Sequence, residues 1–326
     1  MYPLKFKPIL KTLVWGGDKI APFKGIETDQ RNIGESWELS GVKGNESVVA
    51  NGKMAGKTIT ELVIEYKDQL IGKKNYEKTG TEFPILIKFI DAKQDLSIQV
   101  HPDDNLAAKN KSGMKGKTEM WYVVSTDDNA HLTSGLSKSI TPEEYEAMVS
   151  DNTITEALHD YKISPGDVFY IPAGRIHSIG AGSFITEIQQ TSDLTYRIYD
   201  FGRLGLDGKP RELHTGLAKE AIDYSVYEDY RTHYMKEPNK EVCLVDCRYF
   251  TTSLLIADKP FVKDLSTLDS FLVIICIDGK GIVSDDKGNH EPFHRGETLL
   301  IPASTESIEI VPDNAVRILT SFVEPF

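Results

Sequence analysis

A short motif that occurs twice constrains the fold of this chain more than any other feature. Residues 166–173 read GDVFYIPA and residues 296–303 read GETLLIPA. In both, a glycine and an acid precede four mostly apolar residues, and Pro-Ala follows. This pattern predicts a turn, a short strand and a second turn. The two copies either coincide by chance or mark two related β domains; we favour two domains, because both copies lie in stretches rich in strand signals.

Short strand signals outnumber helical ones along the 326 residues. Strands are expected in runs of β-branched or aromatic residues between turn residues, at 82–91, 119–125, 167–172, 183–189, 242–257, 271–277 and 298–302. Helices are expected at 58–71, 104–110 and 141–158. This balance predicts a mainly β fold, a sandwich or jelly roll with a few helical insertions. The polar segment 230–239 is the expected boundary, which gives domains at 1–235 and 236–326.

Composition excludes several classes of function. The net charge of −12 disfavours nucleic acid as a partner, because phosphate contacts need clustered Lys and Arg. The chain has three cysteines, a sparse and odd number that indicates a reducing compartment. Cys243 and Cys247 lack a second Cys/His pair nearby, so a zinc knuckle is not expected. The longest apolar run, 271–277, is too short for a bilayer and the N-terminus lacks signal-peptide features, so we expect a cytoplasmic protein without a membrane partner.

The segment 96–103, LSIQVHPD, contains the first candidate site. Its apolar and polar residues alternate, which predicts a strand with one face on a core. Pro102 ends this strand because it has no N–H to give to a ladder. The second face carries a hydroxyl, an amide and an imidazole, from Ser97, Gln99 and His101. These side chains are either plainly exposed to solvent, or Gln99 and His101 form one wall of a metal site.

A second histidine, His177, occurs in a distinctive spacing. Read from Gly166, the order Gly-x5-Pro-x-Gly-x2-His resembles the second signature motif of the cupin family. The glycines allow tight turns at both ends of the strand, and the chain returns with the histidine directed into the barrel. In the C-terminal copy, Ser304 and Ser307 stand at the places of Gly174 and His177. We therefore predict two cupin domains of jelly-roll form, of which the C-terminal one is degenerate and metal-free.

Glu119, in the strand entrance KTEMWYV, completes a candidate ligand set with Gln99, His101 and His177. Two imidazole nitrogens and two oxygen donors suit zinc and by type also tolerate manganese, iron or cobalt. Only Glu119 brings a negative charge, so a bound divalent ion would stay a strong Lewis acid for a hydroxyl or carbonyl oxygen. We expect one Zn²⁺ per chain. The alternative is that Gln99 and Glu119 are ordinary hydrogen-bonding side chains.

Two lysines stand in unusual places. Lys88 interrupts the apolar strand PILIKFI, where a lysine is costly to bury unless it meets an anion. The alternative is that its stem follows apolar surface and its ammonium reaches solvent at a sheet edge. Lys117 lies two residues before Glu119, so the two would share a strand face if the strand begins that early.

Four segments, LSIQVHPD, GKTEMWY, GRIHSIGAG and SDLTYR, together resemble the type I mannose-6-phosphate isomerase (phosphomannose isomerase) family in its short bacterial form. The opening PLKFKPILKTLVWGG and IGESWELSG resemble that family's N-terminal segments, so the resemblance covers nearly the whole chain. It implies a zinc enzyme that interconverts mannose 6-phosphate and fructose 6-phosphate through a cis-enediol. A small sugar phosphate is then the partner, and a monomer or weak homodimer is expected.

The resemblance also implies a role for each matching position. The family's zinc ligands fall on Gln99, His101, Glu119 and His177. The catalytic positions fall on Arg197, Lys117, Glu187 and Asp193, and the substrate-binding positions fall on Lys88 and Ser97. Arg197 would stabilise an enediolate or assist ring opening, while Glu187 and Asp193 are unranked as the base or as support for Arg197.

One position departs from the family pattern, and two other functions compete. Larger relatives carry a tyrosine two residues after the last histidine ligand, where this chain has Ile179. A different cupin metalloenzyme is disfavoured because its first motif usually reads His-x-His, and here that motif starts with Gln99. A non-catalytic sugar-phosphate-binding cupin is disfavoured by Arg197 beside a full ligand set. A fused nucleotidyltransferase is excluded by the missing Gly-rich nucleotide-binding segment.

Overall fold

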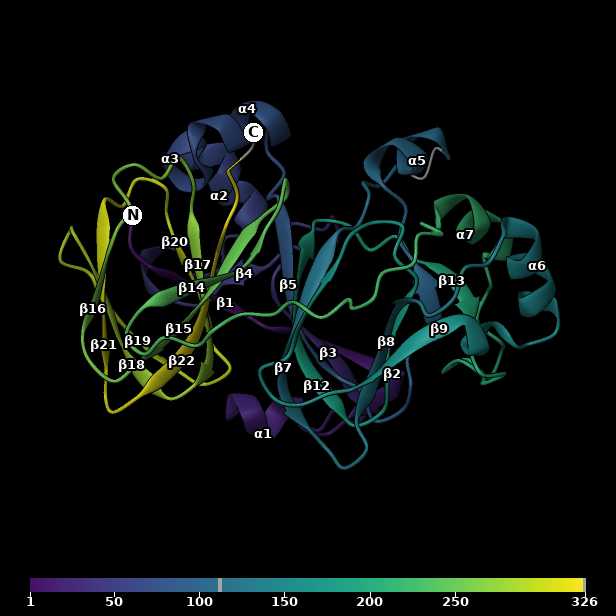
Figure 1. The fold of residues 1–326 in the computed structure, drawn as a ribbon. Helices are drawn as coiled ribbons and strands as arrows, with labels where there is room; N and C mark the ends of the chain where they lie inside the picture. The colour runs from purple at the N-terminus through teal and green to yellow at the C-terminus, as the bar shows by residue number, and fades with distance from the viewer. Residues whose placement is uncertain (111–112, 325–326) are drawn as a thin grey trace.

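The computed structural model describes residues 1–110 and 113–324 and consists mainly of antiparallel β-sheets (Figure 1). The strands before residue 235 are β1 Leu4–Lys7, β2 Ile9–Gly17, β3 Ile33–Leu39, β4 Val48–Val49, β5 Ile85–Asp91, β6 Ile98–Val100, β7 Glu119–Thr126, β8 His131–Leu136, β9 Leu158–Lys162, β10 Val168–Ile171, β11 His177–Ile179, β12 Ser183–Gln190 and β13 Tyr196–Tyr199. The later strands are β14 Glu241–Asp246, β15 Thr251–Ala257, β16 Phe261–Asp264, β17 Leu272–Asp278, β18 Lys280–Asp285, β19 His290–His294, β20 Thr298–Ile301, β21 Ser307–Pro312 and β22 Val316–Phe322.

The helices are short and lie between strands. They are α1 Ile20–Lys24, α2 Ile59–Tyr66, α3 Asp68–Ile71, α4 Lys73–Thr79, α5 Asp104–Lys109, α6 Pro142–Ser150 and α7 Thr215–Ala221, with 3₁₀ turns η1 Gly52–Met54 and η2 Ile154–Ala157. The predicted mainly β fold with a few helical insertions is therefore confirmed. No helix of the described residues is long and apolar enough to cross a membrane.

The strands form two pairs of open sheets. The first pair has the orders β10-β7-β12-β5-β3-β2 and β13-β6-β11-β8-β9. The second pair has the orders β14-β15-β22-β17-β20-β1-β4 and β16-β21-β18-β19, and lies on the left in Figure 1. Because β1 hydrogen-bonds to β20, the start of the chain completes a sheet made mostly of C-terminal strands. The division of the chain at residue 235 stays a prediction.

The repeated motif occupies the same place in both sheet pairs. After the first copy the chain passes from β10 in the six-stranded sheet to β11 in the five-stranded sheet, and after the second from β20 to β21. Gly166 and Gly296, which open the two copies, have φ values of 95° and 82°. That left-handed region favours glycine, and it explains why both copies begin with this residue. The motif therefore reflects a shared architecture rather than chance.

Apolar side chains fill the space between the sheets of each pair. In the first pair, Trp121 and Ile185 of one sheet belong to the same buried cluster as Leu132 of the other. In the second pair, Leu272 of one sheet clusters with Phe293 of the other. All three cysteines carry free thiols, as expected for a chain without a disulfide framework.

Three sequence expectations differ from the structure in their boundaries. The helix expected at 58–71 is split into α2 and α3, because Lys67 adopts a positive φ of 50° after α2. The helix expected at 141–158 ends with α6, whose Thr141 forms a capping box as its sequence indicates. The run 242–257 is a hairpin of β14 and β15 rather than one strand. The helix α4 was not predicted, because its sequence KKNYEKT has no apolar periodicity.

Candidate active site

The five-stranded sheet brings three predicted site residues into one row. His177 on β11 is the register partner of Gln99 on β6, and Gln99 is the register partner of Arg197 on β13. Directly opposed residues of antiparallel strands share a face, so the three side chains lie side by side. Glu119 begins β7 in the six-stranded sheet, and His101 directly follows β6. The site therefore forms between the two sheets.

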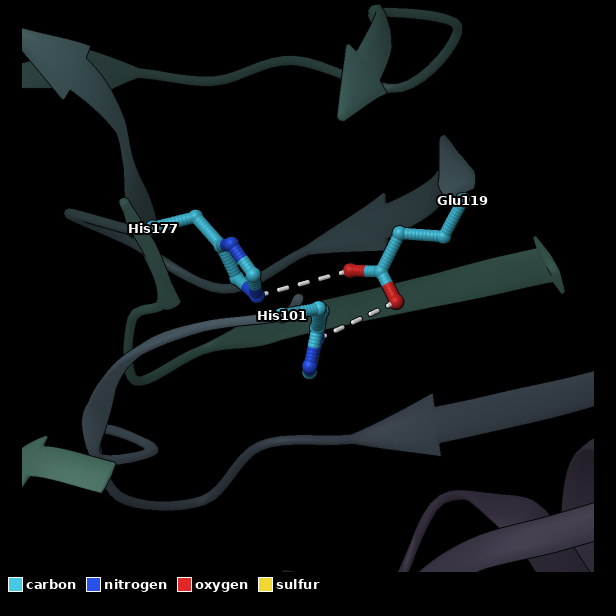
Figure 2. A group of neighbouring side chains, drawn as sticks. All are labelled: His101, Glu119 and His177. Atoms are coloured by element: carbon cyan, nitrogen blue, oxygen red, sulfur yellow. Dashed lines mark ion pairs between the residues drawn. The ribbon is translucent and has the colours of Figure 1, made fainter. Parts of the chain in front are cut away.

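His101, Glu119 and His177 form a compact cluster of potential metal ligands (Figure 2). The Nε2 atoms of His101 and His177 each lie 3.5 Å from a different carboxylate oxygen of Glu119. The ligand atoms of the three residues lie within 4.8 Å of one another, and each residue is at most 1% exposed. Within the described ranges, no other group of three His, Cys, Asp or Glu side chains meets in this way.

Main-chain carbonyls orient both imidazoles. The Nδ1 atom of His101 donates to the carbonyl of Leu194 at 2.9 Å, and that of His177 donates to the carbonyl of Arg175 at 2.8 Å. Because a carbonyl can only accept, each Nε2 keeps its lone pair and is free to bind a metal. Burial lowers the pKa of both rings, that of His177 to about 3. Both are therefore neutral near pH 7, the form that a metal ion requires.

Glu119 supplies the anionic donor of the cluster. Its Oε1 is buried and has no hydrogen-bond partner among the described residues. Buried polar atoms are normally satisfied, so this oxygen marks a place where a ligand fits. Burial, reinforced by the charge of Glu187, raises the pKa of Glu119 to about 7. Two neutral imidazoles and a carboxylate form a donor set that fits a divalent metal ion.

Gln99 lies beside the cluster. Its Nε2 atom is 3.2 Å from Nε2 of His177, and its Oε1 atom accepts a hydrogen bond from Ser97 at 3.3 Å. The oxygen and nitrogen of a side-chain amide exchange places by a flip, and their assignment follows from the surroundings. The amide oxygen of Gln99 can therefore face the space between the histidines. Its role as the fourth ligand stays a prediction.

Lys117 reaches the ligand cluster from the residues before β7. Its ammonium donates to the carboxylate of Glu119 and to Nε2 of His101, the latter at 3.2 Å. It also lies 3.4 Å from Oε1 of Glu187. The side chains of Lys117 and Glu119 thus meet although the strand begins only at Glu119. A group that carries a transferable proton consequently touches two of the potential ligands.

Lys88 is buried in the middle of a sheet, because β5 lies between β12 and β3. Its ammonium is 3.3 Å from Glu187 and 3.8 Å from Glu35, and it lies 5.0 Å from the ring centre of Trp37. The alternative that Lys88 reaches solvent at a sheet edge is therefore wrong. Burial alone would lower the pKa of Lys88, but Glu35 and Glu187 outweigh it and raise that pKa, so the side chain is charged.

Glu187 connects the two buried lysines and also accepts a hydrogen bond from Nε1 of Trp121 at 3.0 Å. Burial alone would raise its pKa, but the ammonium groups of Lys117 and Lys88 lower it to about 2. Glu187 is therefore ionised at neutral pH and holds both lysines in place.

A cavity of about 580 Å³ lies in front of the cluster. The predicted site residues that line it are Lys88, Ser97, Gln99, Lys117, Glu187, Asp193 and Arg197. His101, Glu119 and His177 lie behind Gln99 and Lys117, which contact them. The volume is in the range of small-molecule sites. The structure thus brings all predicted site residues to one place, although their individual roles stay predictions.

Arg197 and Ile179 form two further parts of the cavity wall. The Nη1 atom of Arg197 donates to the carbonyl of Glu212 at 2.9 Å, and its buried Nε has no partner among the described residues. Burial lowers the pKa of Arg197, but a guanidinium stays charged at neutral pH. Ile179 is buried in an apolar cluster, so this position offers no hydroxyl to the cavity.

Several cavity residues escaped the sequence analysis, among them Glu35, Trp37, Arg211 and His214. Glu35 accepts a hydrogen bond from Nε1 of Trp37 at 2.6 Å, and both lie on β3. An acid at alternate spacing from a tryptophan in IGESWELSG was the available signal for this pair. Arg211 and His214 lie outside the strands and helices, where no periodic pattern indicates them.

Known proteins resemble this chain over both sheet pairs. The family model for the type I phosphomannose isomerase catalytic domain matches residues 4–133. A mannose-6-phosphate isomerase named ManA, from Bacillus subtilis, is 36% identical over 92% of this chain and 93% of its own length. The crystal structure of mannose 6-phosphate isomerase from Bacillus subtilis superposes with a TM-score of 0.89 at 31% identity, covering 98% of this chain and 99% of that one.

A solved mannose 6-phosphate isomerase bound with zinc and yttrium has the same fold, with a TM-score of 0.77 at 15% identity. It covers 99% of this chain and 100% of its own. The fold alone is shared at that identity, whereas the Bacillus subtilis relatives agree in sequence over nearly the full length. With those relatives and the matching family model, this chain belongs to the type I phosphomannose isomerase family.

Proposed function

We propose that the chain interconverts mannose 6-phosphate and fructose 6-phosphate through a cis-enediol. The observation that carries the proposal is the buried cluster of His101, Glu119 and His177 behind a polar cavity, in a chain of this family. In the reaction a base removes the proton from C2, the carbonyl moves from C1 to C2, and a proton is returned to C1. Such a site needs a proton-transfer group and a positive charge near the sugar oxygens.

We propose zinc as the metal, one ion per chain, held by His101, Glu119 and His177 with Gln99 as the fourth ligand. Nitrogen and oxygen donors of this kind suit zinc, and a solved relative of the same fold is described as bound with zinc. When bound, the ion would supply a Lewis acid that polarises the oxygens on C1 and C2. Ser97 supports the arrangement by its hydrogen bond to the amide of Gln99.

The other steps of the reaction are assigned to side chains of the cavity. Arg197 would stabilise negative charge that develops on a sugar oxygen, because it lies beside Gln99 in the row of strands. Lys117 would move a proton to or from a sugar oxygen next to the ligand cluster. Glu187 is a poor base at a pKa of about 2, so it would position Lys117. Asp193 is exposed on the cavity wall and is the proposed base.

We also propose that the sugar phosphate is the only partner the site requires. A monomer or weak homodimer in the cytoplasm, without nucleic acid or membrane, is consistent with the acidic composition. Gel filtration with light scattering at micromolar concentration would test the expected monomer or weak homodimer; a stable larger assembly would contradict it.

An isomerase assay with a metal control tests the function. Purified chain is treated with a chelator, dialysed and assayed with mannose 6-phosphate before and after addition of zinc. We expect no turnover without metal and fructose 6-phosphate formation after zinc is restored. As a matched control, His290→Gln removes an exposed histidine outside the site and should leave zinc-dependent activity unchanged. Full activity without metal would overturn the metal role. Binding of mannose 6-phosphate without turnover would support the non-catalytic alternative.

A further inference from the structure

The cavity has two ends with different charge. At the ligand end, Lys88 lies against Glu35 and Glu187. Lys117 lies against Glu119 and Glu187. Both ammonium groups are therefore already matched by buried carboxylates. With these two ammonium groups engaged by carboxylates and Lys11 on the cavity wall donating to Asn45, a phosphate monoester, which carries a charge of about −1.5 to −2 near neutral pH, needs another anchor.

The opposite end is rich in guanidinium groups. Arg203 and Arg211 both donate to the buried carboxylate of Asp200, at 2.5–2.9 Å. One carboxylate cannot neutralise two guanidinium groups, so positive charge remains. Arg211 uses Nε and Nη2 for Asp200, and no contact found among the described residues occupies its Nη1. Arg211 and Arg197 both line the cavity, and the side chain of Glu212, the residue after Arg211, is 84% exposed.

His214 adds an oriented donor to this end. Its backbone N–H donates to the carbonyl of Arg197 at 2.7 Å, and its Nδ1 accepts from the backbone N–H of Arg197 at 3.2 Å. An Nδ1 that accepts leaves the ring hydrogen of a neutral imidazole on Nε2. The carboxylate of Glu212 is 3.9 Å from that Nε2, beyond hydrogen-bond distance. His214 therefore lines the cavity with a donor that a ligand can use.

Strand spacing relates this end to the metal ligands. His177, Gln99 and Arg197 are register partners on adjacent strands, and the backbone of His214 bonds to Arg197 on the far side. Neighbouring strands are about 4.8 Å apart, so His214 lies about 10 Å from Gln99. In an open-chain hexose 6-phosphate, six bonds of about 1.5 Å separate C2 from phosphorus, an extended length of about 8 Å. One substrate molecule can therefore reach both ends.

We propose that Arg211 and His214 bind the phosphate group of the substrate, while C1 and C2 face Arg197 and the ligand cluster. This proposal rests on the proposed isomerase function and names the residues that select a phosphorylated sugar. A planar guanidinium held by Asp200 is pre-organised for a phosphate, because it needs little reordering to bind. Asp200 is then a positioning residue, and Lys88, which the resemblance gives as a substrate-binding position, holds Glu187.

Titration calorimetry and kinetics of variants test the subsite. Mannose 6-phosphate and inorganic phosphate are titrated into zinc-loaded wild type, Arg211→Gln and His214→Asn. We expect Arg211→Gln to weaken mannose 6-phosphate binding and raise KM by about 10- to 100-fold, the effect of a lost charged hydrogen bond. His214→Asn keeps an acceptor for the N–H of Arg197 and should weaken binding by about 5- to 10-fold. In both variants, kcat should change by less than about threefold, and the zinc content should stay at the wild-type value.

A matched control separates the subsite from general loss of charge. Lys209→Gln removes an exposed cation from the same loop, outside the cavity, and should leave binding and KM unchanged. Inorganic phosphate should compete with the substrate in wild type, and Arg211→Gln should weaken that competition by the same factor as its KM. If Arg211→Gln does not fold, His214→Asn decides the question.

The outcomes distinguish the subsite from the function. Unchanged affinity in folded Arg211→Gln and His214→Asn overturns the subsite, even if wild type is a fully active isomerase. Equal affinity of wild type for mannose and mannose 6-phosphate overturns it as well. Phosphate-dependent binding without any turnover in wild type keeps the subsite and overturns the isomerase function instead.

Discussion

The turn segments 166–177 and 296–307 follow the same path but end in different chemistry. Each begins at a left-handed glycine, continues as a strand of the larger sheet and enters the smaller sheet at its last residue. That residue is His177 in the first segment and Ser307 in the second. The backbone path thus follows from glycine, proline and apolar residues in both segments, whereas only the first carries the proposed metal ligand.

Strand register extends this comparison beyond the histidine. In the N-terminal sheets, Ile171 pairs with Glu119 and His177 pairs with Gln99. At the corresponding places of the C-terminal sheets, Ile301 pairs with Leu272 and Ser307 pairs with Asp264. A leucine therefore stands in the C-terminal sheets where the N-terminal sheets carry their buried carboxylate. Leu272 packs with Phe293 and Ile308 in a closed apolar core. An apolar side chain at this place offers no donor to a metal ion, so a site on this scaffold requires a polar residue there.

The largest expected effect comes from making the first segment resemble the second. His177→Ser should abolish stoichiometric zinc binding and lower kcat/KM by at least about 1,000-fold. The reason is that metal stabilisation of charge amounts to several kcal/mol and each 1.4 kcal/mol is a factor of ten. Metal analysis and the isomerase assay measure both effects.

The matched change in the second segment is Ser307→Ala. It should leave zinc content and kcat/KM at wild-type values, because Ser307 lies outside the one group of three potential metal ligands found among the described residues. Loss of zinc in Ser307→Ala, or retained zinc in His177→Ser, would contradict the difference between the segments.

Replacing Arg197 tests whether catalysis can be lost while the metal stays bound. Arg197→Ala should lower kcat by about 100- to 1,000-fold, comparable with removal of one oxyanion donor. The zinc content should stay at one per chain, because no metal ligand is lost. Steady-state kinetics gives kcat and metal analysis of the same sample gives the zinc content, and Lys209→Gln serves as the control. Loss of metal together with activity would make Arg197 structural.

The stability of the metal-free protein should depend on pH through His177. Its pKa is about 3 in the folded chain against an ordinary value of 6.5. As pH falls below 6.5 the unfolded chain takes up this proton and the folded chain does not, so stability decreases. Removing the histidine should therefore flatten the pH dependence by about 1.4 kcal/mol per pH unit. Urea unfolding of chelated wild type and His177→Ser between pH 6 and 5 measures the slopes; equal slopes would contradict the buried neutral ring.

The smallest expected effect comes from the reverse exchange. Ser307→His restores the imidazole in the C-terminal segment, but Leu272 still occupies the place of the carboxylate. The variant should bind no second zinc, and its free energy of unfolding should change by less than about 1 kcal/mol because position 307 is partly exposed. A second bound zinc, measured by metal analysis, would show that the apolar core can open into a site.

Local patterns account for the part of the fold that could be predicted from sequence. The alternation in 96–103 and the Gly-Pro spacing around 166–177 predicted strands that the structure contains, because turn chemistry and burial act within a few residues. The break at Lys67 was missed, since a positive φ is uncommon for a lysine and the sequence carries no signal for it.

Site residues could be predicted where a residue type is rare in the strand or spacing in which it occurs. Lys88 interrupts a buried strand, and the histidines occur in rare spacings. Arg211 and His214 were missed because their part in the cavity depends on a loop that folds against β13 and on the shared carboxylate Asp200. Such contacts join residues through tertiary structure, and no short-range pattern encodes them.

Anomalous diffraction at the zinc edge, from crystals of zinc-loaded protein, tests the central claim most directly. We expect one strong peak per chain, in contact with His101, Glu119 and His177, and no peak beside Ser307. A peak beside Ser307, or none at the three buried residues while the enzyme is active, would contradict the assignment of the metal site to the N-terminal sheets.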